Sequence, residues 1–226
     1  MSKEWHFRES PQNCTLSVET ICQKLQISPF LANLLLRRGF QTLEDLYNYL
    51  SPSVSRLTPP DKWPGIPETA QILTRELLKG KKITIWGDYD VDGITATALC
   101  LDVLEHYGIN ATCYLPNRNT EGYGLNIQGI ESLAKQGTAI LLTVDCGISN
   151  VDAVLRAKEL GMTVIISDHH IPTKDCPKAD ALCNPKTLPR DALPYPDLAG
   201  VGVAFYLMAE VNIFLAKEGN KIDLGD

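Results

Sequence analysis

Short apolar runs alternate with stretches of helical periodicity throughout the last two thirds of the chain. The runs cover residues 83–86, 111–115, 139–144 and 163–167, and the helical stretches cover 68–80, 94–107, 126–136, 149–160 and 198–216. Short buried strands that alternate with helices are typical of βαβ units. We therefore expect an α/β fold, with a parallel β-sheet flanked by helices in a Rossmann-like arrangement.

The first sixty residues have a different pattern. Apolar residues recur at helical spacing over 17–26, 29–38 and 42–50, and a proline-rich stretch, 51–67, follows. We expect a small N-terminal helical segment with its connector over residues 1–60, and the α/β domain over 61–226.

The composition bears on the cellular compartment of the protein. No apolar run approaches the roughly 20 residues of a membrane span, and the polar N-terminus lacks the apolar core of a secretory signal. The seven cysteines are scattered without a CxxC spacing, which favours reduced thiols over a disulfide framework or a zinc site. We expect a soluble cytoplasmic protein with no membrane partner.

The net charge of −6 at first counts against binding to nucleic acid. The negative charge is concentrated in residues 61–226, where five acids fall in three short motifs that follow apolar runs: Asp88, Asp90, Asp92, Asp145 and Asp168. Bound divalent cations would neutralise such a cluster, so the overall charge does not exclude a nucleic-acid substrate.

Three predicted strands end in these motifs, which read GDYDVDG, VDCG and SDHH. Ligand sites of open α/β sheets lie beyond the carboxyl ends of the strands. In extended backbone, Asp88, Asp90 and Asp92 would point to one side at spacings of roughly 6.6 Å. Carboxylates with imidazoles suit Mn²⁺ or Mg²⁺, and the histidines favour Mn²⁺. Two such ions would clamp a phosphate ester, which favours metal-assisted phosphoryl hydrolysis.

Two other interpretations of DYDVDG can be compared with the sequence. An EF-hand loop that began at Asp88 would need a bidentate Glu at its twelfth position, where Leu99 stands, so this interpretation fails. An aspartyl nucleophile of the haloacid-dehalogenase type also follows a buried strand as DxD and stays open, although it does not explain the His pair.

Simple structural roles are open for several single residues. Asp145 and Asp168 could each be a helix N-cap, and His6 and His106 have no context that indicates function. Gly200 and Gly202 open the last helical stretch, where they could serve anion binding or close packing. Lys186 is a minor candidate for a phosphate contact.

The motifs GDYDVDGITATAL, TVDCGIS and SDHH, in that order, resemble motifs one to three of the DHH phosphoesterase superfamily. The stretches YLPNRNTEGYGL and LAGVGVAF, together with the N-terminal segment LLLRRGFQTLEDLYNYLSP, resemble the RecJ-type single-stranded-DNA exonucleases. The resemblance implies metal-dependent 5′→3′ hydrolysis of single-stranded DNA in recombination and repair, with Mn²⁺ or Mg²⁺ as cofactor, two ions in the complete protein, and repair or replication proteins as unidentified partners.

The resemblance also implies roles for individual residues. Metal ligands would be Asp90, Asp92, Asp145 and His169, while His170 would face the scissile phosphate as an electrophile or proton donor. Asp168 would orient a ligand imidazole, and Asp88 would lie just outside the ligands. Arg118 offers a guanidinium for a phosphate, and Tyr114 and Tyr123 offer rings for base stacking; a glycine-rich turn with surface aromatics is the alternative for these three.

The sequence departs from the RecJ pattern near its C-terminal end. RecJ proteins have a further metal-binding Asp after the last long helix, and Asp223 and Asp226 lack the apolar strand that precedes it. We therefore expect a C-terminally incomplete DHH domain over 61–226, with weak or no activity alone. A DHH phosphoesterase for small substrates, such as nanoRNA or cyclic dinucleotides, and a non-catalytic DNA-binding or scaffold module are the alternatives.

Overall fold

The computed structural model describes residues 6, 15–173 and 175–217. The chain divides into two compact units, Met1–Leu57 and Thr58–Asp226, which are described separately below.

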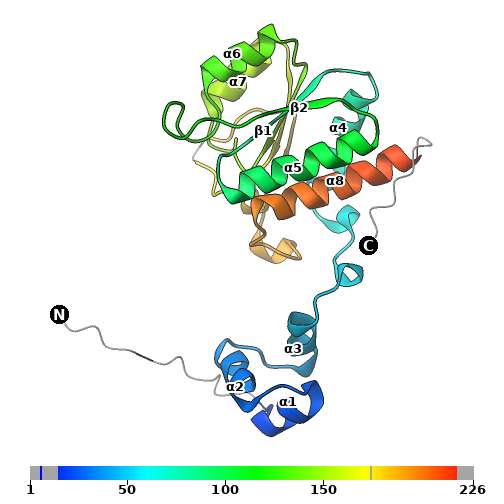
Figure 1. The fold of residues 1–226 in the computed structure, drawn as a ribbon, viewed down its shortest axis with the longest axis vertical. Helices are drawn as coiled ribbons and strands as arrows, with labels where there is room; N and C mark the ends of the chain where they lie inside the picture. The colour runs from blue at the N-terminus through cyan, green and yellow to red at the C-terminus, as the bar shows by residue number, and fades with distance from the viewer. Residues whose placement is uncertain (1–5, 7–14, 174, 218–226) are drawn as a thin grey trace, which may run out of the picture. The chain divides into compact units, whose positions relative to one another are not determined.

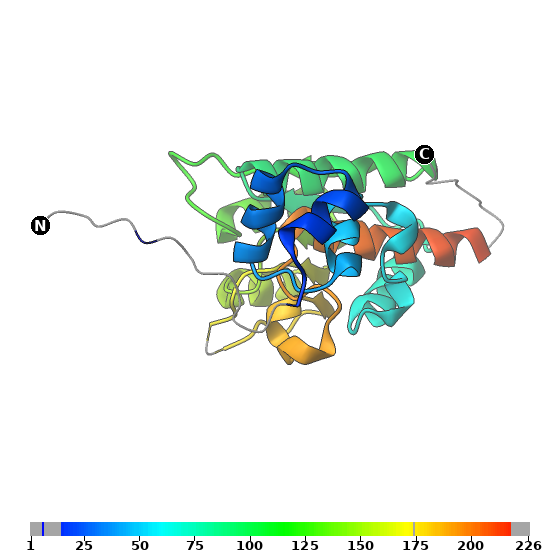
Figure 2. The ribbon, with the colours of Figure 1, turned by 90° about the horizontal axis from the view of Figure 1, so that it is seen from below.

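The first unit is a small cluster of three helices (Figures 1 and 2). Each helix begins at a hydroxyl side chain that accepts a hydrogen bond from a backbone N–H of the first turn: Ser17, Ser28 and Thr42. Apolar side chains from all three helices, among them Ile21, Leu35 and Leu46, form a core of its own. The predicted N-terminal helices are confirmed, as α1 (Val18–Leu25), α2 (Pro29–Arg37) and α3 (Leu43–Leu50).

The second unit is an α/β domain, as the alternating pattern predicts. Its five strands are all parallel and lie in the order β2-β1-β3-β4-β5. The strands are β1 (Ile83–Gly87), β2 (Ala111–Tyr114), β3 (Ile140–Val144), β4 (Thr163–Ser167) and β5 (Ala181–Cys183). The helices are α4 (Ile66–Leu77), α5 (Val91–His106), α6 (Ile127–Lys135), α7 (Val151–Glu159) and α8 (Gly200–Lys217), with 3₁₀ turns at Pro60–Lys62, Pro185–Thr187 and Arg190–Ala192; a further 3₁₀ turn, Val54–Arg56, belongs to the first unit.

Helices cover both faces of the sheet (Figure 1). Side chains alternate between the two faces along each strand, so Ile83 and Ile85 of β1 join the core with α4, α5 and α8, whereas Trp86 joins the core with α6 and α7. Because both faces are covered, β1 and β3 are buried along their whole length and are apolar apart from Thr84, Gly87 and Thr143.

Helix α8 lies beside α5 (Figure 1) and is apolar around most of its circumference. Its 18 residues have a mean hydropathy of 1.4, so length and composition alone would allow it to cross a membrane. Core helices of soluble proteins have the same property, and half of α8 is buried inside the protein.

Two elements differ from the sequence-based expectation. Strand β5 was not predicted, since only three residues form it and the described residues between it and β4 form no regular secondary structure. Helix α5 begins at Val91, three residues before the expected start, which changes the geometry of the acidic motif that precedes it.

Candidate metal and phosphate site

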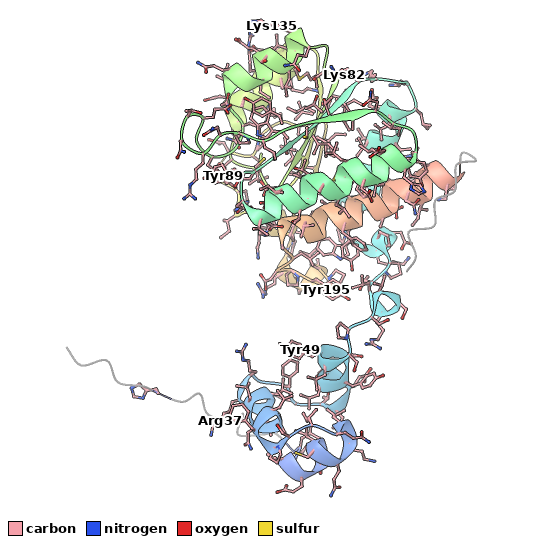
Figure 3. The ribbon with its side chains drawn as sticks, in the orientation of Figure 1. Arg37, Tyr49, Lys82, Tyr89, Lys135 and Tyr195 are labelled. Carbon is pink, nitrogen blue, oxygen red and sulfur yellow. The ribbon has the colours of Figure 1, made fainter. Side chains whose placement is uncertain are left out.

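The first acidic motif is a tight turn between β1 and α5, so the extended geometry expected for it is wrong. Strand β1 ends at Gly87, and Figure 3 shows Tyr89 and Lys82 at opposite ends of this strand. Asp90 caps α5, because its Oδ1 accepts the backbone N–H groups of Asp92, at 2.9 Å, and of Gly93, at 3.0 Å. Asp92 therefore lies in the first helical turn.

Two glycines allow α5 to start directly beside the strand. A Cβ at Gly93 would lie 2.5 Å from the backbone N of Asp88, and one at Gly87 would lie 2.1 Å from Oγ1 of Thr97. These approaches leave no space for any side chain, so the glycines of GDYDVDG fix how the acidic residues are presented.

Asp92 joins the start of α5 to the start of α8. Its Oδ2 accepts the N–H of Gly200 at 2.7 Å, and its Oδ1 accepts the N–H of Val201 at 2.6 Å. The free N–H groups of a helix N-terminus favour an anion, and here that anion is the carboxylate of Asp92. Of the two roles open for Gly200, the structure thus shows anion binding.

Close packing is the second role of Gly200. A Cβ at this position would lie 2.3 Å from Oδ1 of Asp145, so α8 approaches this carboxylate as only glycine permits. At Gly202 the nearest atom to such a Cβ is the end of the Leu198 side chain, at 3.1 Å.

Asp145 follows β3 and is not a helix N-cap, since α7 begins after Asn150. Its φ of 59° places it in the left-handed region, which few residues other than glycine adopt. Its side chain is buried, and this burial raises the pKa of the carboxyl group, while the neighbouring His169 acts in the opposite direction.

The ring of His169 is held in one orientation by the chain segment before α8. Its Nδ1 lies 2.9 Å from the carbonyl oxygen of Leu198, which can only accept, so Nδ1 carries the hydrogen. In the neutral ring Nε2 therefore has a free lone pair, and it lies 3.1 Å from Asp145 Oδ1 and 3.5 Å from Asp92 Oδ2. Asp145 raises the pKa of His169.

Asp168 orients His170 and not the imidazole of His169, which corrects the expected role. Its Oδ1 lies 2.8 Å from Nδ1 of His170 and also accepts the backbone N–H groups of His169 and His170. Its Oδ2 accepts the N–H of Ile148 at 2.9 Å. Asp168 thus ties the end of β4 to the turn after β3, and it is not a helix N-cap.

The donor set fits a divalent cation. The side-chain ligand atoms of two groups converge within 4.8 Å of one another: Asp145, His169 and His170, and Asp88, Asp90 and Asp145. Among the described residues, Oδ1 of Asp88 and Oδ1 of Asp145 are buried and accept no hydrogen bond. Burial raises the pKa of Asp88 as well. Buried carboxylate oxygens without partners, facing an imidazole lone pair, are what a hard cation binds.

Aromatic and basic side chains lie next to these groups. The Tyr123 hydroxyl is 3.2 Å from Nδ1 of His170 and donates to the Asp145 carbonyl at 3.4 Å. The Arg118 guanidinium lies 5.4 Å from the centre of the Tyr89 ring, which in turn meets Tyr123 edge to face. Tyr89 was not singled out from the sequence, although it stands within the first motif. A cavity of about 380 Å³ adjoins this group, with a lining that includes Tyr123, Ser149, Asn150, His170 and Ile171.

Two further candidates, Tyr114 and Lys186, make contacts away from these groups. The ring of Tyr114 stacks on Trp86 at 4.1 Å and its hydroxyl donates to Glu121, so both contacts belong to the fold. The ammonium group of Lys186 donates to Asp197 at 2.6 Å. Asp223 and Asp226 lie outside the described residues.

Comparison with known proteins identifies the family to which this chain is related. Residues 82–224 match the family described as "DHH family, N-terminal domain". The chain is 37% identical over 203 residues to the single-stranded-DNA-specific exonuclease RecJ of Bacillus subtilis and 36% identical over 203 residues to that of Escherichia coli. These alignments cover 90% and 89% of this chain, but only 25% and 34% of the two relatives.

Solved structures of RecJ proteins are also similar to this chain. The structure of RecJ from Thermus thermophilus in complex with Mn²⁺ matches 88% of this chain and 27% of that protein, with a TM-score of 0.67 and 29% identity. An exonuclease RecJ bound to manganese matches 68% of this chain and 38% of that protein, with a TM-score of 0.59 and 34% identity. The chain belongs to the DHH family, and its DHH domain is RecJ-like.

Proposed function

We propose that the chain carries the metal-binding core of a 5′→3′ exonuclease that hydrolyses single-stranded DNA. The observation that carries the proposal is the convergence of Asp88, Asp90, Asp92, Asp145 and His169 at the carboxyl edge of the sheet, with the buried Oδ1 of Asp88 unpaired and that of Asp145 facing Nε2 of His169 at 3.1 Å. The relatives described as single-stranded-DNA-specific exonucleases, and the solved RecJ structures with Mn²⁺ or Mg²⁺, support the substrate and the cofactor.

Asp90, Asp92, Asp145 and His169 would hold the cation, with Asp88 beside them. Asp90 Oδ1 is engaged by two N–H groups, which leaves its Oδ2 for this purpose. A bound divalent cation lowers the pKa of water and neutralises the negative charge that develops on a phosphate during hydrolysis.

The other side chains prepare the phosphate and the leaving oxygen. Asp168 accepts a hydrogen bond from Nδ1 of His170, which fixes this ring so that, in its protonated form, Nε2 can donate a proton to the leaving oxygen. The Tyr123 hydroxyl restrains the same ring, and Arg118 supplies a positive charge for a phosphate of the DNA strand. Tyr89 and Tyr123 offer ring faces that can stack on any base.

Hydrolysis of 5′-phosphorylated single-stranded DNA in Mn²⁺ tests the proposal. We expect slow release of mononucleotides from wild type and loss of at least about 100-fold of this activity in Asp145→Asn, which removes a charge at the position where charge develops. Asp102→Asn is the matched control, because Asp102 is an exposed residue of α5. Wild-type protein that binds Mn²⁺ but cleaves only short RNA or cyclic dinucleotides would favour a small-substrate phosphoesterase. The expected cytoplasmic location stays a prediction.

A further inference from the structure

The loop between β2 and α6 carries two side chains of the proposed site, Arg118 and Tyr123. It is irregular, so no helix or strand ladder fixes the positions of these residues. Its conformation depends on local backbone hydrogen bonds and on side chains that bind its backbone.

Glu121 binds the first part of this loop to the rest of the domain. Its Oε2 accepts the backbone N–H of Asn117 at 2.8 Å, and its Oε1 accepts the hydroxyl of Tyr114 and the side-chain amide of Asn126 at 3.3 Å. The backbone N–H of Glu121 itself donates to the Asn117 carbonyl at 2.8 Å. One carboxylate thus joins the end of β2, the first part of the loop and the start of α6.

The groups that Glu121 binds are themselves held firmly. The ring of Tyr114 stacks on buried Trp86 of β1. Asn126 caps α6, with its Oδ1 accepting the N–H of Gly129 at 2.7 Å, and a Cβ at Gly129 would lie 2.3 Å from the Trp86 ring. The hydrogen bonds from Asn117 and Tyr114 lower the pKa of Glu121, which keeps the carboxylate charged near neutral pH.

We propose that Glu121 is a positioning residue that holds Arg118 and Tyr123 where they meet the DNA strand. This inference rests on the function proposed above and names a residue that does not itself touch the cation ligands. It also gives Tyr114 a role in supporting the loop in place of base stacking.

Glu121→Gln separates this role from general stability. The amide has nearly the shape of the carboxylate but turns one acceptor into a donor, so its NH₂ group must face either the Asn117 N–H or the donors at Tyr114 and Asn126. Glu131→Gln is the matched control: it removes the same charge from α6, where Glu131 pairs with Arg156 at 2.8 Å on the surface. Tyr114→Phe removes only one donor and leaves the carboxylate in place.

Two measurements on the folded protein test the inference. Hydrogen exchange reports the amides of residues 115–125, and fluorescence anisotropy in Mn²⁺ reports the binding of a 5′-phosphorylated, phosphorothioate-linked oligo(dT). For Glu121→Gln we expect faster exchange in this segment and about tenfold weaker binding, with Mn²⁺ affinity within about twofold of wild type. Tyr114→Phe should show a smaller effect in the same direction, and Glu131→Gln should show none.

A combined variant checks that the effect passes through the loop. In an Arg118→Ala, Tyr123→Ala background, Glu121→Gln should weaken oligonucleotide binding by no more than about twofold, because both groups that it positions are already absent. Fully additive losses, unchanged exchange in Glu121→Gln, or faster exchange with unchanged binding would each overturn the inference. Failure of the proposed function would look different: wild type would not bind the oligonucleotide, while Glu121→Gln would still change the exchange of the loop.

Discussion

Replacement of Gly200 by alanine should damage the cluster without replacing any charged residue. The added Cβ would lie 2.3 Å from Asp145 Oδ1, which is about 1 Å inside an ordinary contact. Either the buried carboxylate or the start of α8 must move, and a shift of α8 strains the two N–H bonds to Asp92. Overpacking of this kind costs about 1–3 kcal/mol of unfolding free energy, so we expect a loss in that range.

Gly202→Ala is the control on the same helix. Its Cβ would meet the Leu198 side chain, with the movable Cδ2 nearest, at 3.1 Å, and alanine stabilises a helix relative to glycine by about 0.5–1 kcal/mol. Urea denaturation should therefore show a less stable Gly200→Ala protein and an unchanged or more stable Gly202→Ala protein. Calorimetry should show Mn²⁺ affinity reduced at least about tenfold in the first variant alone, since about 1.4 kcal/mol of displacement cost suffices. A Gly200→Ala protein with wild-type stability and Mn²⁺ affinity would refute the packing of α8 against Asp145.

Two further predictions concern Glu76 of α4 and Tyr123 of the site. Buried Glu76 receives hydrogen bonds from Lys79 at 2.7 Å and Lys81 at 2.6 Å, and these lysines lower its pKa to about 2; because they are partly exposed, Glu76→Gln should cost about 1 kcal/mol at pH 7. A carboxyl group whose pKa is lower in the folded state stabilises the protein fully only above its unfolded-state pKa. In urea denaturation, the difference in unfolding free energy between Glu76→Gln and wild type should therefore shrink as the pH falls from about 4.5 towards 2. A difference that stays constant would contradict the ion pairs. Tyr123→Phe should lower the rate of DNA hydrolysis about tenfold with unchanged Mn²⁺ affinity in calorimetry, because it removes the hydroxyl beside His170 and no cation ligand; a parallel loss of Mn²⁺ affinity would place Tyr123 in the cation site.

The sheet could be predicted from the sequence because its central strands are buried on both faces. Such strands appear as short apolar runs, and β1, β3 and β4 all do. Strand β5 has only three residues, two of them half-buried, and carries no comparable signal. The order of strands depends on crossovers between distant segments, which local patterns do not encode.

The acidic and histidine residues of the site could also be predicted, since they follow three strands that end at one edge of the sheet. The geometry of these residues could not be predicted. Treating DYDVDG as extended ignored that Asp90 is a strong N-cap residue, a signal that the sequence does contain. The Leu198 carbonyl that orients His169 and the carboxylate of Glu121 act through contacts between segments far apart in the sequence or within loops, and no residue pattern indicates them.

The central claim is that the carboxylates and imidazole at the ends of β1, β3 and β4 bind a divalent cation. A crystal of the chain grown in Mn²⁺ and measured at a wavelength where manganese scatters anomalously tests it directly. We expect an anomalous peak within about 2.0–2.4 Å of carboxylate oxygens of the cluster and of Nε2 of His169, and no peak there in Asp145→Asn. Saturating Mn²⁺ with no peak at these residues, or with the same peak in Asp145→Asn, would contradict it.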